Sequence, residues 1–204
     1  MSGIITQNTL DSSGLVKAPE GGGAWNFISK LTASSSATLS FTSGIDATYK
    51  EYIFTFKNIH PETDSVNFTF NMSEDSGSNY NVTKTTSFFE SFNTEAGSTS
   101  LSIMTSKDLA QGTGFQDLCG ILGNANDENL NGYLHLFNPS STTFVKHFLA
   151  RISGNYRIGA PAELDHFIAG YGNTTSAVDA IQFKMSADAI DAGDICLYGI
   201  SSWQ

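Results

Sequence analysis

The chain has 204 residues, of which 40% are hydrophobic and 12% aromatic, enough for the core of a single β-rich domain. The net charge is −10 and the ten basic residues are scattered, so the clustered Lys and Arg that bind nucleic-acid phosphates are absent, and nucleic acid is excluded as an expected partner. Only 15% of the residues are charged, and the polar surface must be built mainly from Ser, Thr, Asn and Gly.

The N-terminal segment, residues 1–24, differs from the rest of the chain because Gly14, Pro19 and a run of three glycines interrupt any regular element. Its apolar residues come in two pairs: Ile4 with Ile5, and Leu15 with Val16. We expect an extended arm that orders only against its own core, a sister subunit or a neighbouring protein. No basic stretch leads into an apolar core, and no run approaches the ~18 apolar residues of a membrane span. The sequence therefore predicts synthesis in the cytoplasm and no membrane insertion.

Strand patterns begin at Trp25 and define a β domain over residues 25–204. The expected strands cover residues 25–32, 37–42, 50–59, 65–73, 80–92, 99–104, 115–122, 130–138, 142–153, 164–171, 178–186 and 194–201. Turn formers separate them and no helical period intervenes, which favours an all-β, antiparallel β-sandwich over an α/β sheet. Two packed sheets in a jelly-roll-like arrangement are the expected architecture.

Residues 50–73 show the clearest alternation, in two runs that flank a loop containing Pro61. Large apolar residues occupy one face of each run and Thr or Asn the other, which predicts an antiparallel hairpin with one buried and one polar face. The same alternation along the chain predicts these core residues: Phe54, Phe56, Phe68, Phe70, Leu134, Phe144, Phe148, Phe183 and Leu197.

The sequence predicts no metal or other cofactor. The four histidines, His60, His135, His147 and His166, lack the clustered spacing of metal sites, although His135 and His147 could meet across two strands as a zinc pair. Strand histidines hydrogen-bonded to neighbours are the favoured interpretation. The two cysteines, Cys119 and Cys196, lie in apolar strand patterns and are expected to be buried free thiols.

Acidic and amide residues gather in the predicted turns rather than in a catalytic pattern. Asp75 and Asn79 bracket a glycine but lack the further ligands of a calcium loop, so a plain turn is expected. Asp127 and Glu128 are expected to be solvated. Asp165 and Glu163 lie near His166 and could mimic part of a hydrolytic triad, but no GxSxG motif or comparable nucleophile accompanies them. The sequence therefore predicts that the protein is not an enzyme.

The run FTSGIDATYKEYIFTFKNIHPETDSVNFTFNMSEDSGSNYNVTKTT resembles a family of tailed-bacteriophage virion proteins, common in viruses of marine and freshwater bacteria. The resemblance continues through DLAQGTGF, GYLHLFNPSSTTFVKHF, FIAGYGNTTSAVDAIQFKMS and IDAGDICLYGI, and covers roughly residues 41–200. The opening IITQNTLDSSG is similar to the short N-terminal strands by which many such proteins attach to a virion.

The resemblance implies a non-enzymatic structural protein that is made in the bacterial cytoplasm and exposed on the virion, with other tail or capsid proteins as partners. A trimeric tail-fibre or receptor-binding module is one expectation, with a host cell-surface glycan as a further partner; a capsid decoration or cement protein is the alternative. Receptor-facing loops are expected at residues 74–81, 93–100, 124–131 and 154–163, which contain Asp75, Asn79, Asn126 and Asn155.

Two further sets of residues follow from the same expectation. The apolar C-terminal strand is expected at the trimer interface, because monomers rarely leave such surface in water. Its candidates are Tyr198, Ile200 and Trp203. The N-terminal arm is expected to attach the protein to the virion through its apolar residues Ile4, Ile5, Leu15 and Val16.

Overall fold

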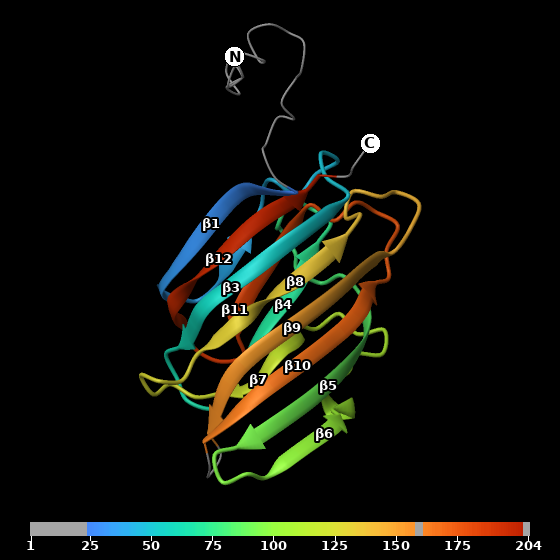
Figure 1. Ribbon diagram of the computed structural model, residues 1–204. Coiled ribbons are helices and arrows are strands. Elements are labelled where there is room, and N and C mark those ends of the chain that lie inside the picture. The colour runs from blue at the N-terminus through green and yellow to red at the C-terminus, as the bar shows by residue number, and fades with distance from the viewer. Residues whose placement is uncertain (1–23, 158–160, 202–204) are drawn as a thin grey trace, which may run out of the picture.

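The computed structural model describes residues 24–157 and 161–201, which form two antiparallel β-sheets that face each other (Figure 1). The strands are β1 (Trp25–Ser36), β2 (Leu39–Phe41), β3 (Glu51–Pro61), β4 (Val66–Ser73), β5 (Lys84–Thr94), β6 (Thr99–Ile103), β7 (Gln116–Leu122), β8 (Leu130–Phe137), β9 (Lys146–Arg157), β10 (Pro161–Gly172), β11 (Ala180–Met185) and β12 (Ile190–Ile200). One 3₁₀ turn, η1 (Thr105–Lys107), precedes β7. Each of the twelve strands overlaps one of the strands expected from the sequence.

The strand order identifies the architecture as a jelly roll with an extension. The eight-stranded sheet has the order β1-β12-β3-β8-β9-β10-β5-β6, and the four-stranded sheet the order β2-β11-β4-β7. The first four strands of the large sheet and the whole small sheet reproduce the two facing sheets of a jelly roll. The hairpins β9-β10 and β5-β6 are additions that widen the large sheet beyond β8 (Figure 1). The predicted antiparallel sandwich is confirmed.

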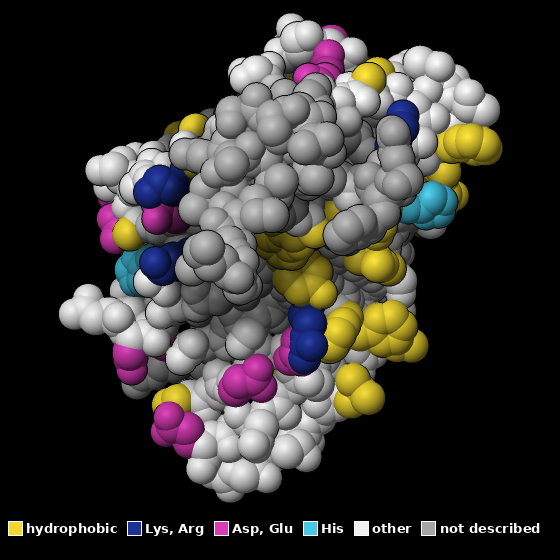
Figure 2. Space-filling model, turned by 45° about the horizontal axis from the view of Figure 1, so that its top comes forward, with side chains coloured by type: hydrophobic (Ala, Val, Ile, Leu, Met, Phe, Trp, Pro, Cys, Tyr) yellow, Lys and Arg dark blue, Asp and Glu magenta, His cyan; other side chains and the backbone are white. Residues whose placement is uncertain are grey.

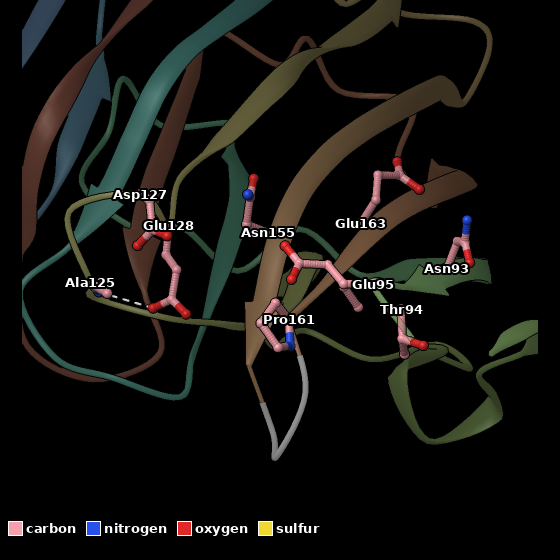
Figure 3. A pocket seen from close by; sticks show the side chains of 10 residues that line it. Asn93, Thr94, Glu95, Ala125, Asp127, Glu128, Asn155, Pro161 and Glu163 are labelled. Atoms are coloured by element: carbon pink, nitrogen blue, oxygen red, sulfur yellow. Dashed lines mark hydrogen bonds between the residues drawn. The ribbon is translucent and has the colours of Figure 1, made fainter. Parts of the chain in front are cut away.

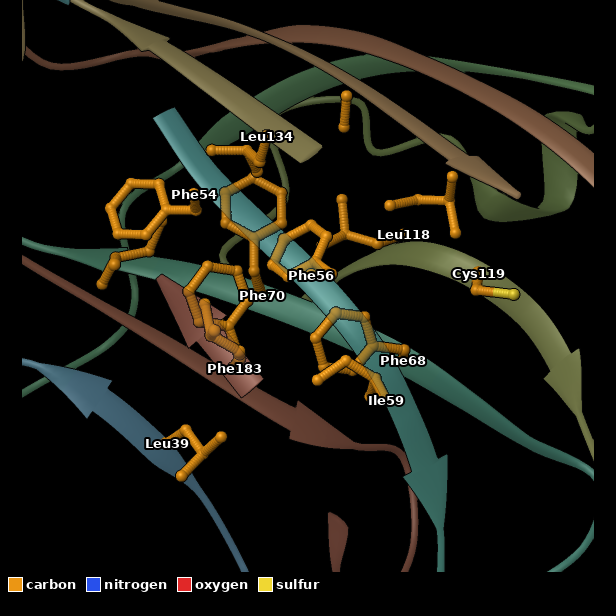
Figure 4. Close-up of a cluster of buried hydrophobic side chains, with 14 of the residues drawn as sticks. Leu39, Phe54, Phe56, Ile59, Phe68, Phe70, Leu118, Cys119, Leu134 and Phe183 are labelled. Atoms are coloured by element: carbon orange, nitrogen blue, oxygen red, sulfur yellow. The ribbon is translucent and has the colours of Figure 1, made fainter. Parts of the chain in front are cut away.

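Aromatic rings from both sheets form the centre of the core (Figure 4). Phe183 on β11 lies within 5.2–6.4 Å, between ring centroids, of five other rings: Phe41, Phe54, Phe56, Phe68 and Phe70. Eight of the nine predicted core residues are buried, and the prediction for Phe144 is wrong, since its side chain is 68% exposed. Phe144 lies in the turn before β9, where the alternation of the strand does not apply.

The predicted hairpin over residues 50–73 is also wrong, because β3 and β4 belong to different sheets. β3 pairs with β12 and β8, whereas β4 pairs with β11 and β7. The two strands face each other across the core, so each shows one apolar face, as the strands of a hairpin also would. Alternation reports which face is buried and does not report which strand is the neighbour.

The polar face of β4, expected to meet solvent, is largely buried. Thr69, Asn71 and Ser73 are 0–3% exposed, because the segments that connect β4 to β5 and β6 to β7 fold over this face. Asn71 donates from its amide to the carbonyls of Tyr80 and Thr113, one in each segment. The Lys84 ammonium donates to the Asn71 side-chain oxygen and to the Val82 carbonyl. A buried polar network therefore closes this side of the sandwich.

The strands β9, β10, β5 and β6 extend beyond the facing sheet, which has only four strands, so other segments bury their inner face. β7 packs against β9, and the segment around η1 lies against β5. Asp108 accepts a hydrogen bond from the Phe88 backbone, and Thr86 bonds to the buried Gln116 on β7. These contacts cover the inner face of the added hairpins.

Candidate functional site

Three segments far apart in the sequence meet at one end of the large sheet and enclose a pocket of about 380 Å³ (Figure 3). They are the end of β5 with the following turn, the loop between β7 and β8, and the adjoining ends of β9 and β10. The lining residues are Asn93, Thr94, Glu95, Ala125, Asp127, Glu128, Asn155, Pro161, Ala162 and Glu163. Three of the four loops expected to face a receptor therefore contribute to one pocket.

Strand pairing fixes one side of this pocket. Glu163 on β10 lies directly opposite Asn155 on β9 and Asn93 on β5, so a carboxylate is flanked by two amides in one cross-strand row. The Glu95 backbone N–H donates to the Pro161 carbonyl at 3.0 Å, which ties the turn after β5 to the start of β10.

The loop between β7 and β8 forms the opposite side. The Glu128 carboxylate accepts a hydrogen bond of 2.9 Å from the Ala125 N–H and is almost completely buried (Figure 3). Gly123 leaves room for this carboxylate, because a Cβ at that position would lie 1.9 Å from a Glu128 carboxylate oxygen and would displace it. The neighbouring Asp127 is exposed. The expectation that Asp127 and Glu128 are both solvated is thus correct for Asp127 and wrong for Glu128, whose carboxylate holds the loop in place.

The lining is rich in hydrogen-bond acceptors and contains four carboxylates, two Asn amides and no Lys or Arg. Carboxylates accept hydrogen bonds from hydroxyl and ammonium groups, and Asn amides both donate and accept. The pocket therefore suits a ligand rich in hydroxyl groups and disfavours anions. Across residues 24–157 and 161–201, no three or more His, Cys, Asp or Glu side chains are grouped so that they could hold a metal ion.

The predicted receptor-facing residues divide into two pairs. Asn155 lines the pocket, and Asn126 is exposed in the loop that forms one side of it. Asp75 and Asn79 lie outside the pocket and bond to each other at 2.7 Å, in a turn that the Ser73 hydroxyl supports. These hydrogen bonds also hold the pKa of Asp75 below its usual value. The predicted turn is confirmed there.

The other predicted sites are only partly within the described residues. Tyr198 and Ile200 are half-buried on β12, and the Tyr198 ring lies 5.5 Å from that of Trp25 and 5.7 Å from that of Phe27. The attachment residues Ile4, Ile5, Leu15 and Val16, and the interface residue Trp203, lie outside the described part of the chain.

The histidines have separate neighbours. His135 pairs with Glu51 at 2.9 Å, whereas the His147 ring lies 5.8 Å from that of Tyr171. His166 is fully buried and pairs with Glu90 at 2.9 Å, and this hydrogen bond lowers the pKa of Glu90.

Two further predictions concern side chains outside the pocket. Asp165 points to the opposite face of β10 from His166 and pairs with Arg151 at 2.7 Å, so the two do not form part of a triad. Both cysteines are free, as predicted; Cys119 is buried, which raises its pKa to about 12, and Cys196 is half-buried rather than buried.

Sequence analysis named the loops around the pocket but missed Glu163 and Asn93 as partners of Asn155. Both lie at the edges of the expected loops, next to the expected strands, and only the register of β9, β10 and β5 places them in one row with Asn155. The only available signal was a polar residue at the outward position of each strand next to a turn, which is also the ordinary pattern of a solvated strand end.

Comparison of the chain with protein-family models, with curated proteins and with solved structures found no match. The part of the chain that the structure describes has no helix long and apolar enough to cross a membrane.

Proposed function

We propose that the protein is a non-enzymatic bacteriophage structural protein, exposed on the virion as a homotrimeric host-adhesion module. In this proposal its N-terminal segment anchors it to other virion proteins, and a sugar of the host surface is its ligand. The sequence resemblance supports the assignment to a virion. The convergence of three polar loops in one pocket supports adhesion, because binding residues are often carried on loops that a rigid scaffold positions.

The chemistry of the pocket supports a neutral or amino-substituted sugar as the ligand. The row formed by Asn155, Glu163 and Asn93 offers several acceptors and donors at fixed spacing, which matches neighbouring hydroxyls on a sugar ring. An anionic sugar would meet four carboxylates without a compensating cation among the lining residues.

Binding to host polysaccharide tests the ligand. Purified protein is expected to bind immobilised host-surface polysaccharide, and Glu163→Gln combined with Asn155→Ala is expected to weaken binding at least tenfold, a loss of ~1.4 kcal/mol. Glu74→Gln combined with Asn79→Ala is the matched control, since both residues are outside the pocket. Biolayer interferometry measures both variants. Equal affinities for the two would exclude this pocket as the sugar site.

The same preparation separates adhesion from hydrolysis. A pocket with several carboxylates is also the setting in which glycoside hydrolases place their acid and nucleophile. Incubation with the bound polysaccharide is expected to release no new reducing ends. Release that Glu163→Gln abolishes would replace the adhesion proposal by an enzymatic one.

Deletion of residues 2–20 tests the anchor. The truncated protein is expected to keep the far-ultraviolet circular dichroism spectrum of the full chain, because β1 begins only at Trp25. It is expected to be absent from purified particles, as measured by mass spectrometry of virions produced with the truncated gene. Normal incorporation would rule out this segment as the attachment site, and gold labelling of full-length protein distinguishes a tail position from a capsid position.

A further inference from the structure

The two outer faces of the sandwich have opposite character. On the small sheet the outward residues are polar, for example Gln182, Lys184 and Asn67. The large sheet carries most of the exposed large hydrophobic side chains, and Figure 2 shows hydrophobic side chains gathered on the surface that this view presents. Among the described residues, nine large hydrophobic side chains are exposed, and eight of them lie on the large sheet; the ninth is Phe144.

Six of these eight side chains form one continuous patch, here called the apolar face, on β8 and the four added strands. Tyr133, Arg151, Phe167, Phe89 and Ile103 lie directly opposite one another in a row across five strands. The apolar face consists of Tyr133, Leu149, Phe167, Phe89, Leu101 and Ile103, which are 40–77% exposed. A hollow of about 460 Å³ opens in its middle, lined mainly by these side chains, and Leu101 protrudes at its rim.

The only charges inside this patch neutralise each other. Arg151 lies over the Phe167 ring, 4.6 Å from its centroid, and forms two hydrogen bonds with Asp165 at 2.7 and 3.0 Å. The Asp165 carboxylate thus neutralises the charge of the Arg151 guanidinium, and the planar guanidinium forms part of the apolar face. Sequence analysis missed this surface, because β10 has apolar residues on both of its faces and therefore resembles a fully buried strand.

We infer that the apolar face is where copies of this chain associate. Its six side chains expose roughly 600 Å² of apolar surface, which is at the upper limit for a monomer and matches the apolar share of a standard interface of ~800 Å² per partner. Charge restricts where a second copy can bind. Two chains of net charge −10 repel each other over acidic surface, so copies are expected to meet at this patch, where Arg151 and Asp165 neutralise each other, whereas a basic partner would be drawn to the acidic pocket.

This position has a consequence for adhesion. Glu163 lines the pocket and also a second hollow that contains Tyr133 and Arg151, so the pocket adjoins the apolar face. Copies that associate through this face hold their pockets side by side, and linked weak sites bind a polyvalent surface with high avidity. The inference rests on the oligomeric part of the proposed function and is independent of the ligand.

Light scattering coupled to size-exclusion chromatography tests the interface. The wild-type protein is expected to have a mass three times the 21.9 kDa of one chain. The double variant Phe167→Ser with Leu101→Ser is expected to have the mass of one chain and an unchanged circular dichroism spectrum. Phe144→Ser removes a ring that is more exposed than Phe167 and lies outside the apolar face, and it is expected to leave the mass of the wild type.

Three results would overturn the inference: a wild-type mass of one chain at micromolar concentration, an oligomer that survives the double variant, or dissociation by Trp25→Ser instead. Hydrogen exchange of the wild type gives a second measurement that needs no substitution. Peptides from 87–103 and 149–169 are expected to exchange more slowly in the oligomer than in the chains that dilution dissociates. Peptides from β4 and β11 are expected to exchange at the same rate in the oligomer and in the dissociated chains. Because neither experiment contains a sugar, its failure would leave the proposed ligand untouched.

Discussion

Replacing Phe183 by Ala is expected to lower the free energy of unfolding by ~4 kcal/mol, because it removes the ring that five other core rings contact. β11 lies between β2 and β4, so the backbone cannot collapse freely into the cavity. In a domain of this size ~4 kcal/mol corresponds to a decrease of roughly 8–16 °C in the melting temperature. Urea titration and calorimetry measure the two quantities.

Phe144→Ala is the matched control for this substitution. Its ring is 68% exposed, so its removal is expected to change stability by no more than ~0.5 kcal/mol. Comparable losses from both variants would mean that Phe183 does not occupy the centre of the core.

The contribution of Lys84 to the stability of the protein is expected to rise with pH between about 7 and ~10.4. Burial lowers the pKa of this amine to about 7 in the folded protein, whereas the unfolded chain titrates near ~10.4. In this interval the unfolded state binds more protons, and each pH unit adds at most ~1.4 kcal/mol to the free energy of unfolding. Below about pH 7 both states are charged, and the full destabilisation is present.

Lys84→Met isolates this contribution. The variant leaves Asn71 and the Val82 carbonyl without their donor, which lowers stability by a constant amount, but it abolishes the slope that Lys84 causes. Urea titrations of both proteins at pH 7, 8, 9 and 10 measure the difference. Parallel curves would show that the folded protein does not depress the pKa of Lys84.

The sequence located the strands well because alternation is a local property. Residues 66–72 alternate strictly, and β4 occupies them with the predicted apolar residues inward. The partner of each strand is not local. β3 and β4 are adjacent in the chain, yet they separate into different sheets, and nothing between Pro61 and Val66 distinguishes a sheet-crossing connection from a hairpin loop.

The same limit applies to the site. Asn155 and the neighbouring loops could be predicted as exposed from their turn residues, but their convergence depends on two hairpins that lie outside the jelly-roll core. The hairpins β5-β6 and β9-β10 provide most of the pocket and nearly all of the apolar face. Jelly rolls can vary such additions without disturbing the core, so the proposed function depends on a part of the fold that the pattern of the core does not specify.

The position of β12 has a consequence for biosynthesis. This last strand lies between β1 and β3, so residue 200 pairs with both residue 25 and residue 51. Between the end of β3 at Pro61 and the start of β12 at Ile190 lie 128 residues, and a ribosome adds them in about 6–26 s. During that time β1 and β3 lack the strand that pairs with both, and these two strand edges stay open to other nascent chains. We therefore expect this domain to complete its folding only after β12 has left the ribosome, and to depend on chaperones at high expression. A truncated chain that ends before Ile190 lacks β12. It has no strand that pairs with both β1 and β3, and it cannot form this sheet.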